Sequence, residues 1–345
     1  VAQFTSIAGF SLVQPFLPLY IRELGVTDPA QQALWSGIAL GAMGVSFGLM
    51  APLWGHLADR HGRKLMVARA MFGGVVTLVL MGMCRNVYEL VALRILQGAL
   101  TGTVTATNAL VSSVVPRARM GYSLGLNQTM VIMGMSLGPW LGGNLAEIWG
   151  YRVTFFVAAG VLLVAGLVCL LGAHEQFDPA QVRDGNGSIG LREAFGRRGL
   201  GALLLVLFFI SLAQSFTGPV FPLLVEGIVG RARAASATGM LLGIGGLTAG
   251  LAALVAGRLG DRKGHAQVLV WSTLLSGLVT MPHAVVTTMA QLLPLRALLG
   301  LGTGGIQPAL SAMIASAVSR DMIGRAYGLT RCPSALGMAA GPMLC

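Results

Sequence analysis

Long apolar runs fill most of this 345-residue chain. A helix needs about 20 mostly apolar residues to cross a bilayer, and only helices or closed barrels satisfy their backbone hydrogen bonds in lipid. The runs here are continuous, unlike the ten-residue alternating segments of a membrane barrel, so helices are favoured. The sequence predicts eleven membrane-spanning helices, near residues 1–21, 33–55, 65–84, 87–112, 120–145, 151–172, 200–225, 235–257, 266–284, 288–316 and 324–345.

Charged residues are too few to cover a soluble protein of this size. Asp, Glu, Lys and Arg make up 10% of the chain, whereas a soluble domain contains roughly 25%. The 49 glycines suit helices that pack closely in lipid, because small residues let two backbones approach. The four cysteines have no paired spacing, so neither a disulfide framework nor a zinc site is indicated. No P-loop and no catalytic cluster occurs within the spans, which disfavours an ATPase or a membrane enzyme.

The basic residues indicate an orientation rather than a ligand. The net charge is +11, yet 15 of the 23 Lys and Arg residues follow even-numbered spans and five follow odd-numbered spans. Basic loops mark the cytoplasmic side of a membrane, so the N-terminus and the even-numbered loops are predicted to be cytoplasmic. The distribution lacks the clustered basic stripe of a nucleic-acid-binding protein. The remaining three, Arg94, Arg296 and Arg331, lie inside apolar runs.

The two halves of the chain repeat each other. Four blocks recur in the same order with an offset of 202 to 204 residues: Pro15 and Pro18 with Pro219 and Pro222, 55–62 with 257–264, Arg94 with Arg296, and Gly138-Pro139 with Gly341-Pro342. The first half holds six spans, an even number, so the second copy starts on the same side of the membrane and has the same orientation, which is a transporter architecture. The sequence predicts a first bundle at 1–172, a cytoplasmic linker at 173–199 and a second bundle at 200–345.

The repeat also predicts that the chain is incomplete. After Pro139, 33 residues precede the linker, but only three follow Pro342, so a twelfth helix is expected to be missing. Residues 1–21 lack the basic start and the cleavage site of a signal peptide. Because no initiator Met is present, the sequence is expected to begin inside its first helix.

A glycine-containing loop joins the second and third spans. It reads G-H-L-A-D-R-H-G-R-K, and its key residues are Gly55, Asp59, Arg60, Gly62, Arg63 and Lys64. Glycine lets helix ends turn tightly, and an Asp here can cap a neighbouring helix or pair with an arginine. The second half repeats the block as Gly257, Asp261, Arg262 and Gly264 but lacks the Arg-Lys pair, so we expect a weaker, structural copy there.

Two further motifs lie inside predicted helices. The fourth span contains R-I-L-Q-G, which places Arg94 and Gln97 one helical turn apart, where they can share a hydrogen-bond network. A membrane-buried arginine is costly, so Arg94 either faces the cavity or snorkels to the interface. In the fifth span Pro139 is expected to kink the helix. The glycines around it leave a smooth face for a partner helix: Gly134, Gly138, Gly142 and Gly143.

These motifs resemble those of the major facilitator superfamily, and the fifth-span motif resembles that of its twelve-helix drug/proton antiporters. The resemblance implies an all-α membrane protein whose two parallel six-helix bundles rock about a central cavity. It implies that the loop motif latches the outward-facing state, that Arg94 and Gln97 tune proton exchange, and that the fifth-span motif prevents proton leak. It further implies a monomeric inner-membrane exporter of small molecules, driven by a proton gradient without a cofactor.

The cavity is expected to lack a carboxylate. All twelve Asp and Glu residues lie in predicted loops, in the linker or at span ends. Neutral or anionic substrates are therefore predicted, because a lipophilic cation would meet no buried carboxylate. The proton carrier stays open among His283, Asp59, Glu23, Glu226 and a residue in the ends that are expected to be missing. The candidate cavity residues are Gln14, Phe16, Asn108, Asn127, Gln128, Gln214, Phe216, Gln307 and Arg331.

Two other functions stay open for a chain with this pattern. One is a metabolite carrier on the same fold, for a sugar or an organic anion, which could work as a uniporter. The other is a transport-dead sensor, although the intact loop and fifth-span motifs argue against it. Substrate-induced proton release would separate antiport from uniport, and counterflow in liposomes would exclude the sensor.

Overall fold

The computed structural model describes residues 1–114, 120–172, 199–316, 330, 333–338 and 340–341. Every regular element within these residues is a helix. The first half contains α1 (Ala2–Ser11), η1 (Gln14–Phe16), α2 (Leu17–Glu23), α3 (Pro29–His61), α4 (Arg63–Gly82), α5 (Val87–Leu100), α6 (Thr103–Val114), α7 (Met120–Trp149) and α8 (Tyr151–Gly172). The second contains α10 (Leu200–Phe216), α11 (Phe221–Val229), η4 (Arg231–Arg233), α12 (Ala234–Lys263), α13 (His265–Thr280), η5 (Met281–Ala284), α14 (Met289–Gly304) and α15 (Ile306–Ser316).

Helices occupy the first ten predicted spans, and most of the eleventh lies outside the described residues. Seven helical segments of the described chain are long and apolar enough to cross a membrane. Several spans predicted as continuous helices are interrupted in the described chain: α1, η1 and α2 make up the first, α5 and α6 the fourth, α10 and α11 the seventh, and α14 and α15 the tenth. The breaks follow from local chemistry: proline lacks a backbone donor, as at Pro15 and Pro219, and Gly102 adopts a φ of +128° between α5 and α6.

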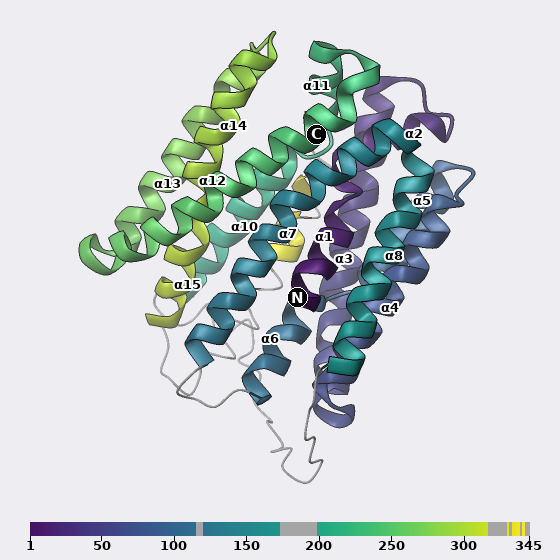
Figure 1. Ribbon diagram of the computed structural model, residues 1–345. Coiled ribbons are helices and arrows are strands. Elements are labelled where there is room, and N and C mark those ends of the chain that lie inside the picture. Colours follow the sequence, from purple (N-terminus) through teal and green to yellow (C-terminus); the bar gives the residue numbers. More distant parts are fainter. Residues whose placement is uncertain (115–119, 173–198, 317–329, 331–332, 339, 342–345) are drawn as a thin grey trace.

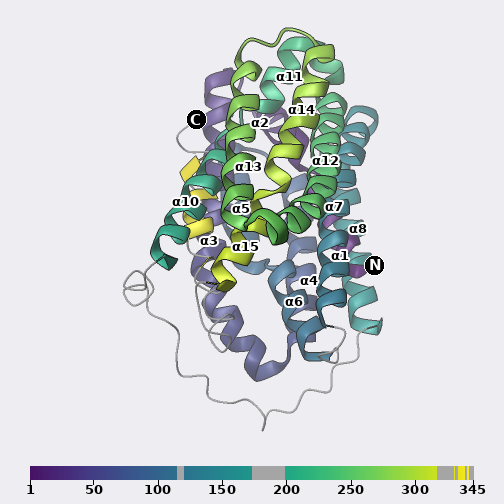
Figure 2. The same ribbon diagram turned by 90° about the vertical axis from the view of Figure 1, so that its left-hand side faces the viewer.

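The helices of the two halves lie on opposite sides of the molecule (Figure 1). Helices α4, α5 and α8 form one side and α13 and α14 the other, while α7 and α12 pack along each other between them. Turned by 90°, the second half faces the viewer (Figure 2). The connections α2–α3, α4–α5 and α11–α12 lie at one end of the molecule, called the upper end below (Figure 1). Chain segments therefore alternate in direction, as a polytopic membrane protein requires.

Repeat-related residues make matching hydrogen bonds in the two halves. Ser11 donates to the carbonyl oxygen of Gly134 at 2.9 Å, and Ser215 donates to that of Gly337 at 3.2 Å. Each pair joins the first helix of its half to the fifth. The helix-ending glycines Gly62 and Gly264 also match, with φ values of +90° and +97°. Both lie in the region that favours glycine, which explains why the repeat retains it there.

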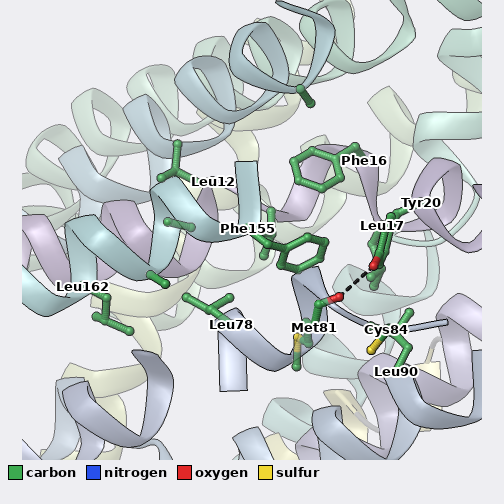
Figure 3. Close-up of a cluster of buried hydrophobic side chains, with 14 of the residues drawn as sticks. Leu12, Phe16, Leu17, Tyr20, Leu78, Met81, Cys84, Leu90, Phe155 and Leu162 are labelled. Atoms are coloured by element: carbon green, nitrogen blue, oxygen red, sulfur yellow. Dashed lines mark hydrogen bonds between the residues drawn. The ribbon is translucent and has the colours of Figure 1, made fainter. Parts of the chain in front are cut away.

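An aromatic core holds the first half together (Figure 3). Phe16 is fully buried, stacks on Tyr151 at 5.2 Å between ring centroids and meets the edge of Phe155 at 5.7 Å. Tyr20 is also fully buried and donates from its hydroxyl to the carbonyl of Met81 at 2.7 Å. Phe16, the last residue of η1, thus lies in this core. Its predicted place in the substrate cavity stays a prediction.

The Tyr20 hydroxyl provides a direct test of this core. We expect Tyr20→Phe to lower the free energy of unfolding by about 1 kcal/mol, because the Met81 carbonyl loses a buried donor. Tyr88→Phe is the control, because Tyr88 is exposed and lacks such a bond among the described residues. Thermal melting of the purified protein in detergent measures both, and equal melting temperatures would contradict the assignment.

Candidate functional site

The fifth-span motif lies where three helices meet. A Cβ at Gly138 or Gly142 would overlap α1, at Ser11 and at the backbone of Leu12. A Cβ at Gly143 would overlap the carbonyl of Ala235 on α12, which belongs to the other half. Helix α7 continues as one α-helix through Pro139. The glycines thus let α7 approach both its own half and the opposite half at backbone distance.

Helix α12 contributes its own small residues to the same seam. Gly239 lies against the carbonyl of Pro139, Gly243 against that of Ser136, and Gly246 against the side chain of Ser136. Their spacing of four and three residues places them on one helical face. This second row was not singled out in the sequence, although its spacing is typical of close helix packing. Helices α7 and α12 pack against each other along this seam between the halves (Figure 1).

Arg94 is buried within α5, and only 5% of it is exposed. Its Nη1 donates to the Oε1 of Gln97 at 3.0 Å and lies 3.8 Å from the Sδ of Met43 on α3. The hydrogen bond expected from the spacing is present, and the side chain contacts α3 rather than snorkelling to the interface. Among the described residues no carboxylate lies within 4 Å of it, and its Nε has no partner.

Arg296, the repeat partner of Arg94, is held differently. Its guanidinium lies over the ring of Phe221 at 3.5 Å from the centroid, which is a cation–π contact between α14 and α11. The residue one turn after it is Leu299, so it lacks the glutamine that Arg94 contacts. Its Nε is likewise buried without a partner in the described part of the chain. The two halves therefore hold equivalent arginines in different settings: Arg94 is buried and Arg296 is partly buried, and among the described residues no carboxylate lies within 4 Å of either.

The loop motif lies at the α3–α4 connection. Gly62 ends α3 and begins α4, and Arg63 and Lys64 form the first turn of α4, both partly exposed. The side chains of Asp59 and Arg60 lie outside what the structure describes. In the second copy Asp261, near the end of α12, faces His265, the first residue of α13, with Oδ1 3.5 Å from Nε2. The expectation that this copy is a weaker, structural one stays a prediction.

The predicted cavity residues are scattered over four helical segments. Gln14 in η1, Gln128 in α7, Gln214 and Phe216 in α10 and Gln307 in α15 are exposed, while Asn127 in α7 is buried. The side chain of Asn108 and the whole of Arg331 lie outside the described residues. A hollow of about 520 Å³ between α12, α13 and α14 contains none of them; Leu251, Val255, Lys263 and Trp271 line it. That hollow does not mark the predicted cavity.

Two arginine contacts were missed by the sequence reasoning. Arg69, one of the 15 basic residues assigned above to the loops after even-numbered spans, lies in α4 with its guanidinium 3.4 Å from the ring centroid of Trp54. Arg22 forms an ion pair with Glu226 across the two halves. The second contact had a signal in the sequence, because the two residues have the same 204-residue offset as the proline block.

The comparisons with known proteins agree with the repeat and the motifs. The sequence profile of the Major Facilitator Superfamily matches residues 1–228 and 203–345. The chain belongs to the Major Facilitator Superfamily. It is accordingly a multi-span membrane transporter rather than an enzyme, as the sequence predicts.

Curated members of the superfamily match along nearly the whole chain. Multidrug resistance protein MdtG of Serratia proteamaculans is 36% identical over 346 residues, which covers 99% of this chain and 84% of that protein. The protein of the same name from Proteus mirabilis is 35% identical and covers 99% and 85%. The matched region therefore spans both halves of the chain.

Solved structures share the fold at low sequence identity. The nucleoside transporter NupG superposes with a TM-score of 0.81 at 15% identity, covering 99% of this chain and 89% of that one. A bacterial homologue of the human lysosomal transporter Spinster, in an inward-facing and unoccupied conformation, gives 0.79 at 14% identity, covering 99% and 79%. These likenesses concern the major facilitator fold, which the sequence predicts.

Proposed function

We propose that this superfamily member is a secondary active exporter of small, drug-like molecules that works by proton antiport. The observation that supports it most is the 35–36% identity, over 99% of the chain, to proteins named for multidrug resistance. The protein lies in an inner membrane and acts as a monomer, with its N-terminus and even-numbered loops in the cytoplasm. The upper end of Figure 1 then faces the outside.

Alternating access is proposed to occur by rocking of residues 1–172 against 200–345, joined by the linker 173–199. The α7–α12 seam supports this, because its glycines bring two backbones together with few side chains to interlock. Gly138 and Gly142 fix α7 on α1, while Gly143 contacts the moving half. The loop motif with Asp59 is proposed as the latch on the cytoplasmic side.

Charge placement supports neutral or anionic substrates. Glu23 and Glu226 lie at the upper ends of their spans, Asp28 is the N-cap residue of α3, and Glu89 lies in the first turn of α5. By contrast Arg94 and Arg296 lie within helices, and no carboxylate in the described part of the chain is within 4 Å of either. A permanent cation entering such a cavity would meet positive charge without compensation.

Flux in proteoliposomes tests the proposal. With an acidic lumen, outward proton flow should drive uptake of an anionic or neutral fluorescent dye, and collapsing the pH gradient should abolish it. We expect a quaternary ammonium dye of similar size to be carried about tenfold more slowly, which corresponds to about 1.4 kcal/mol of discrimination. Gradient-independent flux would indicate a uniporter, and faster transport of the cation would overturn the charge argument.

A further inference from the structure

Arg22 and Glu226 join the two halves at the upper end of the molecule. Arg22 lies in the last turn of α2 and Glu226 in α11. Both guanidinium Nη atoms contact the carboxylate, Nη1 reaching Oε1 and Nη2 reaching Oε2 at 2.7 Å. The side chains are only 17% and 15% exposed. A bidentate pair of this kind is among the stronger ionic contacts, and its partial burial reduces screening by salt.

The repeat places this pair on the axis that relates the halves. Arg22 follows Pro18 by four residues, and Glu226 follows the equivalent Pro222 by four, so the two positions correspond. When equivalent positions in two symmetric copies touch each other, they lie at the symmetry axis. For parallel repeats that axis runs along the membrane normal. The pair therefore lies on the central line between the bundles. Two equal charges at these equivalent positions would push the halves apart, whereas Arg22 and Glu226 attract each other.

Each member of the pair also has a partner within its own half. Arg22 donates from Nη2 to the Oε1 of Gln32 at 3.1 Å, and Gln32 is itself fixed by donating to the carbonyls of Val26 and Thr27 at 2.8 and 3.1 Å. Glu226 has Arg231, whose Nε lies 3.6 Å from Oε1 and whose side chain is 77% exposed. If the halves separated at this end, both groups would keep a local contact.

We propose that Arg22 and Glu226 are the outer gate of this transporter and that the gate opens by partner exchange. Glu226 passes from Arg22 of the other half to Arg231 of its own half, while Arg22 stays on Gln32. A hollow of about 380 Å³ beside the pair, lined in part by Leu223 and Gly227, gives the carboxylate room to turn. Exchange keeps the charge of Glu226 paired in both states, which lowers the cost of opening. The role rests on the alternating access and orientation proposed above.

Spin labels on the two upper ends measure the gate directly. Thr27→Cys in the first half and Ala232→Cys in the second are exposed positions for the labels, with the four native cysteines replaced by serine. In Arg22→Glu two carboxylates face each other, so we expect the longer distance to gain at least about fivefold in population. Arg22→Glu/Glu226→Arg should restore the short distance. Two controls accompany these variants. The distance between labels at Thr27 and Met83, both in the first half, should not change in Arg22→Glu. Arg233→Glu, which alters a neighbouring exposed arginine, should leave the Thr27–Ala232 distance unchanged.

Transport by the same variants tests the exchange step. The double swap places an arginine at position 226 beside Arg231. The gate should still close through the swapped pair, but it should reopen poorly because the arginine at position 226 cannot pair with Arg231, and flux should fall. Adding Arg231→Glu supplies an acceptor for that arginine and should recover flux. An unchanged distance distribution in Arg22→Glu would overturn the gate, and failure of the triple variant to exceed the double swap would overturn the exchange. If the wild-type protein carries no dye but its distances respond as expected, the proposed function fails and the gate stands.

Discussion

Gly142→Val should be the most damaging single substitution in the described part of the chain. A Cβ there would overlap the carbonyl and the Cα of Leu12, and backbone atoms of a packed helix cannot turn aside as a side chain does. Overpacking a well-filled site costs about 1–3 kcal/mol or more, and here α7 would also separate from α1 over several residues. We expect a melting temperature in detergent many degrees lower and a large aggregated fraction in size-exclusion chromatography.

Gly160→Val supplies the matched control for this prediction. Gly160 also lies within a membrane helix, α8. A Cβ built there would have no atom within 4 Å apart from its chain neighbours and the adjacent backbone of α8 itself. The two variants change the same atoms in helices of the same kind, so their difference isolates the contact with Leu12. Similar melting temperatures for both would show that α7 does not need its backbone approach to α1.

The fold was predictable because membrane helices are encoded locally. The length of the apolar runs predicted ten spans that the structure contains. The internal repeat predicted which helices of the first half correspond to which helices of the second. The breaks inside spans were less visible, since a transmembrane proline or glycine can be tolerated without ending a helix. The first span is an example: η1 interrupts it, and Phe16 at the end of η1 is fully buried.

The candidate site was harder to predict than the fold, because its contacts join distant helices. The spacing of Arg94 and Gln97 gives their hydrogen bond, since both lie on one helix. The contact of Arg69 with Trp54 depends on how α3 packs against α4, and no local sequence pattern predicts that packing. The Arg22–Glu226 pair is intermediate: aligning the halves makes the two positions equivalent, and only the opposite charges suggest that they touch.

Arg94→Met should separate transport from stability. The variant removes a buried cation that no described carboxylate within 4 Å neutralises, and replacing such a charge with an apolar side chain of similar length is often neutral or stabilising by about 1–4 kcal/mol. We therefore expect an unchanged or higher melting temperature. If Arg94 tunes proton exchange, as the family resemblance implies, pH-driven flux should nevertheless fall roughly ten- to a hundredfold, the loss expected when about 1.5–3 kcal/mol of interaction with a charged group disappears.

Gln97→Leu completes this test, because it copies the second half, where Leu299 follows Arg296 by the same three residues. The variant keeps the Arg94 cation and removes its hydrogen-bond acceptor at 3.0 Å, so it should lower flux less than Arg94→Met does. Arg85→Met, at an exposed position in the α4–α5 connection, controls for loss of a positive charge alone. Flux in Arg94→Met equal to the wild type would remove Arg94 from proton coupling. A lower melting temperature with normal flux would make it a structural residue, because the guanidinium would then matter for packing against α3 and not for exchange.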